Sequence, residues 1–148
     1  MSDVLLRDLV EGVRSTLATA VEVERATAHE ALTEDMPDAQ MLEIYAEEGS
    51  ADPTTKTDRT TFGGGLRQER CQVMADYYTR LRSSIGDDMA LLIDGIDSIR
   101  AVLNSQDHQP LFGTAGIVSF TWSWQRVIFE RASKSYVGAR FTLDFRLK

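Results

Sequence analysis

Apolar residues return at every third or fourth position in two segments, which is the spacing of one face of an α-helix. The first set is Leu5, Leu6, Leu9, Val10, Val13 and Leu17. The second set is Ile85, Met89, Leu92, Ile93, Ile96, Ile99 and Leu103. Ser2 or Asp3 can cap the first segment, and Ser83 or Ser84 can cap the second. The pattern therefore predicts two principal helices.

Apolar and polar residues alternate in four further segments, as expected for strands that bury one face. In 41–48 the inward positions are Leu42, Ile44 and Ala46, and in 67–82 they are Cys71, Val73, Ala75, Tyr77 and Leu81. In the last two segments they are Val118, Phe120, Trp122, Trp124 and Ile128, and then Val137, Ala139, Phe141, Leu143, Phe145 and Leu147. The short connection RASKS predicts that these two strands form a hairpin. The segment 21–32 fits either a strand or a helical turn.

From Gly49 to Gly65 the sequence GSADPTTKTDRTTFGGG has neither period. It predicts a long flexible loop over 49–66, and loops of this length in compact domains are commonly functional. The order of elements is helix, strand or strands, loop, strand, helix and hairpin. The simplest layered arrangement is a single α+β domain over 1–148, with one mixed, mainly antiparallel sheet. Both helices are expected to pack on one face of that sheet.

The formal net charge is −7, from 23 acidic and 16 basic residues. An acidic chain is a poor match for tight binding to duplex DNA, because affinity for phosphates comes from clustered basic groups. Cys71 is the only cysteine, so no disulfide can form within the chain. We expect it to be a buried, unreactive thiol. The sequence has no apolar run of membrane-spanning length and no signal-peptide pattern. We therefore expect a protein that is made in the cytoplasm and used there or in a particle assembled there, without a membrane partner.

The candidate catalytic and metal-binding residues are isolated. His29 and His108 have no second ligand at metal-binding spacing, and the three glycines at 63–65 lack the rest of a phosphate-binding motif. The carboxylates Asp87, Asp88, Asp94 and Asp97 lie on the second helix, where they suit its dipole and its solvated face. The sequence therefore predicts a non-enzymatic protein without a metal or cofactor. Trp122 and Trp124 fit core packing, or alternatively an interface anchor.

Three strings in the C-terminal half carry a resemblance. They are LIDGI at Leu92–Ile96, SFTWSW at Ser119–Trp124 and YVGARFTL at Tyr136–Leu143. In this order they resemble the tail terminator proteins of long-tailed bacteriophages, also called tail completion or neck proteins, which have relatives in gene transfer agents. The resemblance covers Glu69–Lys148, and residues 1–48 match only in the kind of element expected.

The resemblance implies a virion subunit that is assembled in the host cytoplasm and forms a ring, typically a hexamer. The ring would bind the head-proximal end of the tail tube, stop tube polymerisation and dock to the head–tail connector or stopper, with DNA passing through its lumen. Its candidate contacts to the tube or a neighbouring subunit lie in the long loop, with weaker candidates at Trp122 and Trp124. The loop candidates are Lys56, Arg59, Phe62, Gly63, Gly64 and Gly65.

Three alternatives remain open from the sequence, one of which is a host regulatory adaptor captured near phage genes. A head-closure (stopper) or connector-adaptor protein of the neck would have the same ring geometry but bind on the portal side. A small enzyme or ligand-binding domain would need a pocket with convergent polar groups.

Overall fold

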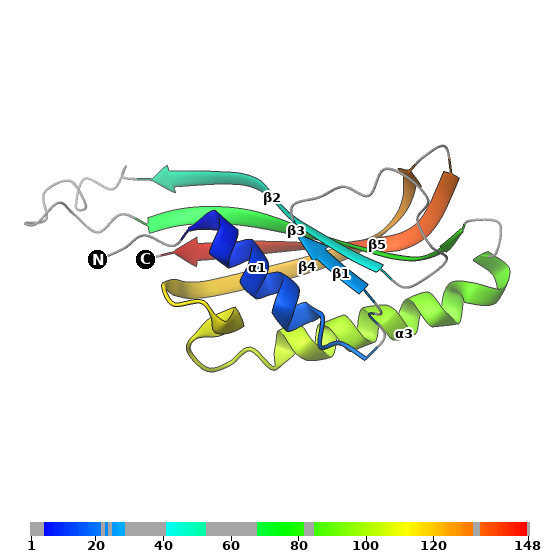
Figure 1. Cartoon of the computed structure of the whole chain (residues 1–148), viewed down its shortest axis with the longest axis horizontal. Coiled ribbons are helices and arrows are strands. Elements are labelled where there is room, and N and C mark those ends of the chain that lie inside the picture. The colour runs from blue at the N-terminus through cyan, green and yellow to red at the C-terminus, as the bar shows by residue number, and fades with distance from the viewer. Residues whose placement is uncertain are drawn as a thin grey trace, which may run out of the picture.

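A computed structural model describes residues 5–21, 23, 25–28, 41–52, 68–81, 85–131 and 134–147. Within these residues the chain forms three helical elements and five strands (Figure 1). The helical elements are α1 (Leu6–Leu17), α3 (Ile85–Asn104) and the short 3-10 helix η2 (Leu111–Gly113). The strands are β1 (Arg25–Ala28), β2 (Met41–Asp52), β3 (Gln68–Leu81), β4 (Ile117–Arg131) and β5 (Lys134–Leu147).

The five strands form one sheet in the order β1-β2-β3-β5-β4. β2, β3, β5 and β4 are antiparallel to their neighbours, whereas β1 runs parallel to β2. The predicted mixed, mainly antiparallel sheet is therefore confirmed, as is the hairpin of the last two strands. Within the ambiguous segment 21–32, residues 25–28 form a strand.

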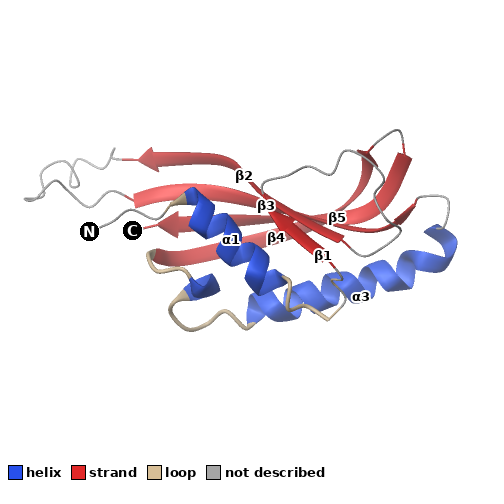
Figure 2. Ribbon diagram, in the orientation of Figure 1, coloured by secondary structure: helices blue, strands red, loops and turns tan. Residues whose placement is uncertain are grey.

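Both long helices lie on the same face of the sheet, which gives two layers (Figure 2). α1 packs over β1 and β2, and α3 packs over β3 and β5. Their buried stripes meet the inward side chains of the strands in one core. This confirms the predicted stripes in part, because Ile93, predicted to lie on the stripe of the second helix, is 51% exposed. The buried helical residues are Leu9, Val10, Val13, Leu17, Leu92, Ile96, Ile99 and Leu103. The α+β fold with two helices on one sheet face is thus confirmed.

The beginning of α1 differs from the prediction. The N-cap residue is Leu5, which makes no side-chain cap bond, and Ser2 and Asp3 lie outside the described residues. Leu5 and Leu6 are 61% and 49% exposed, although their spacing placed them on the buried stripe. The period gives the direction of a side chain but not how closely its neighbours cover it. Leu6 lies beside the small residues Ala46 and Gly49 of β2, where two hollows leave its side chain accessible. Only the residues from Leu9 onward lie over the core.

The prediction placed the start of the long loop too early, at Gly49. β2 continues through Gly49 and Ser50 to Asp52, paired with β3 from Cys71 to Gln68. Gly, Ser and Asp are poor strand formers, and the pairing with a long neighbouring strand overrides that preference. The remainder of the predicted loop, 53–66, lies outside the described residues. Similarly, β4 and β5 extend into the predicted RASKS connection, to Arg131 and from Lys134.

A register shift at the start of β4 changes which residues face the core. The pairing with β5 shifts between Ile117 and Ser119, which leaves Val118 as the extra residue of a β-bulge. Ile117 is buried and Val118 is 48% exposed, the reverse of the predicted alternation. The predicted inward position of Val118 is therefore wrong.

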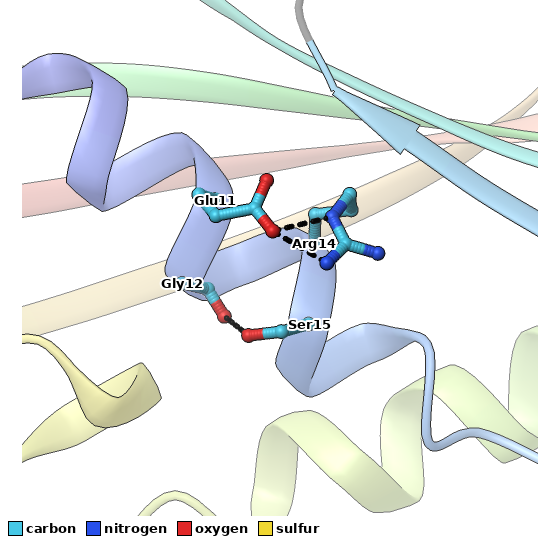
Figure 3. Close-up of polar contacts among 4 residues, drawn as sticks. All are labelled: Glu11, Gly12, Arg14 and Ser15. Carbon is cyan, nitrogen blue, oxygen red and sulfur yellow. Dashed lines mark hydrogen bonds and ion pairs between the residues drawn. The ribbon is translucent and has the colours of Figure 1, made fainter.

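α1 approaches η2 at a glycine. A Cβ atom built on Gly12 would lie 2.6 Å from the carbonyl oxygen of Phe112 and 2.4 Å from Oγ1 of Thr114. On the neighbouring turn, the Ser15 hydroxyl donates to the Gly12 carbonyl over 3.2 Å, and Arg14 Nε donates to Glu11 over 2.9 Å (Figure 3). The helix can lie this close to η2 because residue 12 has no side chain.

Candidate protein interface at the sheet edge

β4 forms one border of the sheet and is 15 residues long. Its inner side pairs with β5 along its whole length, and no described strand pairs with its outer side. A long unpaired edge presents a row of backbone donors and acceptors to other chains. Proteins usually shorten, charge or cover such an edge, so an open one indicates a possible binding surface.

The side chains of β4 on the helix-bearing face grow more exposed along the strand. Phe120 is anchored, with its ring centroid 4.8 Å from that of Phe112. Trp122 is half-buried, 6.4 Å from the ring of Phe141. Trp124 and Ile128 are 43% and 45% exposed. Since α1 and α3 lie mainly over the other four strands, this end of β4 extends beyond the helical layer.

Trp122 and Trp124 therefore differ in role. Trp122 meets the core-packing expectation, because it packs against the main core. Trp124 lies opposite Phe141 in the register but keeps much of its indole exposed. Exposed tryptophan beside exposed isoleucine on an open edge strand is the composition of an interface anchor. The alternation in the sequence placed both residues on one face without separating these roles.

The opposite border of the sheet carries two hollows beside α1. One, of about 410 Å³, is lined by Leu6, Arg7, Val10 and Ala46. The other, of about 340 Å³, is lined by Leu6, Gly49, Ser50, Glu69, Arg70 and Cys71. The exposed side chain of Leu6 contributes to both, so this border also has accessible apolar surface. Sequence reasoning missed it, because Leu6 was assigned to the core and Gly49 to a loop.

A buried ion pair lies on the face of the sheet without helices. Asp76 is fully buried and accepts from Arg140 Nε at 2.8 Å and from Arg140 Nη2 at 3.2 Å. The Tyr45 hydroxyl donates to the same carboxylate over 2.9 Å. The hydrogen bond to Asp76 raises the pKa of Arg140. Burial, followed by the charge and the hydrogen bond of Asp76, raises the pKa of Tyr45 to about 12.

Apolar packing surrounds this ion pair on one side. Tyr78 and Phe129 meet edge to face with ring centroids 4.5 Å apart, and Tyr136 lies 6.3 Å from Tyr78. The Arg140 guanidinium carbon lies 5.4 Å from the centroid of Phe129, within range of a cation–π interaction. The polar group is thus a structural part of the fold, held on three adjacent strands.

The other candidate residues either lie outside the described residues or stand apart within them. Lys56, Arg59, Phe62, Gly63, Gly64 and Gly65 all lie outside the described residues, as does His29. Cys71 is buried on the core face, as expected, and burial raises the pKa of its thiol. His108 is exposed, with Nε2 3.5 Å from the carboxylate of its neighbour Asp107.

Of the four candidate carboxylates on α3, two have described side chains and two do not. Asp94 and Asp97 are exposed, as a solvated face requires, and Asp97 accepts from Arg100 over 2.8 Å. The side chains of Asp87 and Asp88 lie outside the described part of the chain. Among the residues that the structure describes, no three His, Cys, Asp or Glu side chains gather as metal ligands would.

Comparison with protein-family models and with curated proteins finds no match to this chain. Within the described segments, no helix is both long enough and apolar enough to cross a membrane.

Proposed function

We propose that this chain is a structural subunit of a virus-like particle, a tail terminator of a long-tailed bacteriophage or gene transfer agent. Copies of it form a ring, typically of six, at the head-proximal end of the tail tube. The ring stops tube polymerisation and joins the tail to the connector or stopper, and DNA passes through its lumen. The long loop, with Lys56, Arg59 and Phe62, meets the tube or a neighbouring subunit.

The observation that carries this proposal is the open border strand β4, with its exposed Trp124 and Ile128. A surface of this kind suits a protein that works by contact with other chains. The three strings on which the resemblance depends fall on α3, β4 and β5, in the same order along the chain. The net charge of −7 also suits the wall of a channel, because like charges keep DNA phosphates from binding.

Removal of the chain from a particle-producing strain tests the proposal. We expect tails of uncontrolled length that do not attach to heads, because nothing stops the tube from growing. Re-expression of the unchanged chain should restore tails of one length, and the protein should be found on purified tails. Length is measured by electron microscopy, and location by mass spectrometry of separated heads and tails.

Two results contradict the proposal. Tails of normal length that lack only their heads, with the chain found on purified heads, indicate a head-closure or adaptor protein. Particles that are normal in every respect without the chain exclude a role in the neck.

A further inference from the structure

The two borders of the sheet carry opposite formal charge. Within their bounds, β1 and β2 contain four carboxylates and one arginine, a net charge of −3. β4 and β5 contain five basic and two acidic residues, a net charge of +3, of which the Arg140 charge is balanced by Asp76 on β3. The strand order places these two pairs at opposite borders, as Figure 1 shows for β2 and β4. Such a subunit attracts the opposite border of another copy and repels the same border.

The border at β2 is also open over part of its length. β1 pairs with β2 only over Met41–Ile44, so no described strand covers the outer side from Tyr45 to Asp52. Residues 46–50 are exposed. The bulge at Glu47 interrupts the ladder with β3, and regular pairing resumes at Glu48. An edge of this length can accept part of a strand from another chain.

The strand directions allow the two borders to meet between identically oriented copies. β2 is antiparallel to β3, β3 to β5 and β5 to β4, so β4 and β2 run in opposite directions. If two copies stand side by side in the same orientation, β4 of one is antiparallel to β2 of the next. The alternation of the sheet then continues from one subunit into its neighbour.

From these features we propose that Thr121–Val127 of β4 in one copy pair head to tail with the open edge of β2 over Tyr45–Asp52 in the next, in the ring of the proposed function. Beyond Val127, β4 leaves this edge, because β1 already covers Met41–Ile44. Trp124 lies opposite Gly49 and enters the hollow lined by Leu6, Gly49 and Cys71. Glycine on an edge strand leaves a space that an aromatic side chain from the facing strand fills. The contact also covers Leu6, so exposed apolar surface on both copies is removed from water.

This register makes two further pairs. Ser123 faces Ser50 on the side of the sheet without helices. Arg126 lies opposite Ala46, beside the bulged Glu47. An arginine–carboxylate contact at the rim adds specificity and speeds association. Because the two surfaces are different, the contact is heterologous. A repeated heterologous contact closes a ring when the rotation between neighbouring copies divides a full turn, and it builds an open filament otherwise.

Interchain disulfide formation tests this pairing. Three full-length variants are made: Ser50→Cys, Ser123→Cys and the double variant. Each is oxidised in two conditions, as the purified protein at high concentration and within purified particles. Native Cys71 is 3% exposed but lines the hollow, so the unchanged protein, oxidised in the same way, is the control for its reaction. We expect the double variant to give a ladder of covalent multimers on non-reducing gels. Each single variant should stay monomeric, because neither residue meets its own copy.

Charge reversal gives an independent readout that needs no new thiol. Glu47→Lys or Arg126→Glu alone should weaken self-association on the order of tenfold, and the two together should restore most of it. The matched control is Asp94→Lys, which makes the same change of charge on the exposed face of α3. It should leave association unchanged in analytical ultracentrifugation.

Two outcomes overturn the pairing. Covalent dimers from Ser123→Cys alone indicate that two β4 strands meet each other. The absence of interchain disulfides from the double variant, both free and in particles, excludes this contact altogether. In either case the proposed function survives if the chain remains on purified tails and still controls their length. If the chain is absent from purified tails and does not control their length, the proposed function itself is overturned.

Discussion

Asp76 is the residue whose chemistry depends most on its surroundings. Its carboxylate is fully buried, and it accepts hydrogen bonds from Arg140 and Tyr45 on the two neighbouring strands. Removing one member of a buried ion pair leaves the other charge without compensation. Asp76 therefore holds together three strands that are far apart in the sequence.

We predict that Asp76→Asn lowers the free energy of unfolding by roughly 2–4 kcal/mol. This is less than for a fully enclosed pair, because the Arg140 side chain is 32% exposed. The control is Asp97→Asn, which breaks the exposed pair with Arg100 and should cost less than about 1 kcal/mol. Urea denaturation measures both variants. Equal losses in the two would show that the buried pair contributes no more than a surface pair.

Tyr45 gives the same cluster a dependence on pH. Its pKa is raised to about 12, above a value of about 10 in the unfolded chain. The folded state therefore holds this proton more tightly. The resulting stability is fully present below about pH 10 and is lost as the pH rises through about 12.

We predict that Tyr45→Phe is less stable than the unchanged protein at pH 8, by about 1 kcal/mol for the lost hydrogen bond. The difference should shrink between about pH 10 and pH 12, because only the unchanged protein loses the contribution of Tyr45 there. Chemical denaturation at a series of pH values measures it. A difference that stays constant up to pH 12 contradicts the assigned role of Tyr45.

At the scale of elements, the position of α1 depends on its contact with η2. Gly12 allows the close approach, and the ordinary preference of a helix interior is for alanine over glycine by roughly 0.5–1 kcal/mol. For Gly12→Ala, helix propensity therefore predicts a gain in stability, whereas packing against η2 predicts a loss. The sign of the measured change distinguishes them.

We predict that Gly12→Ala destabilises the protein by about 1–3 kcal/mol, because the new methyl group meets the Phe112 carbonyl. Ser15→Ala, on the exposed side of the same helix, should change stability by less than about 0.5 kcal/mol. Thermal unfolding followed by circular dichroism compares the two variants. Stabilisation by Gly12→Ala would mean that α1 does not lie against η2 as described.

Also at this scale, the sequence predicted most of the fold but not where the elements end. Periodicity identified both helices and the inward faces of β3 and β5, because nearly every core position there is apolar. It failed at Leu5, the N-cap residue, and at Leu6, where small residues on β2 leave the side chain uncovered. It also failed at Val118, where a bulge shifts the alternation. It also failed at Gly49, where pairing between strands outweighs local preference. These outcomes depend on contacts between distant segments.

For the whole molecule, the candidate interface could be predicted only in part. The pattern placed Trp122 and Trp124 on one strand face, but their different exposure follows from the strand order and from the helices covering other strands. The opposite charges of the two borders also become visible only once β1 and β2 are known to lie across the sheet from β4. The loop candidates around Arg59 stay predictions, since they lie outside the described residues.

We expect copies of this 16.5 kDa chain to assemble into a closed ring. Native mass spectrometry measures this assembly, with the purified chain alone over a range of concentrations and again after addition of tail tubes. We predict one dominant assembly at a whole multiple of the chain mass, most simply six, whose size does not change with concentration. A protein that stays monomeric in both conditions, or that forms an open-ended series of sizes, contradicts the claim.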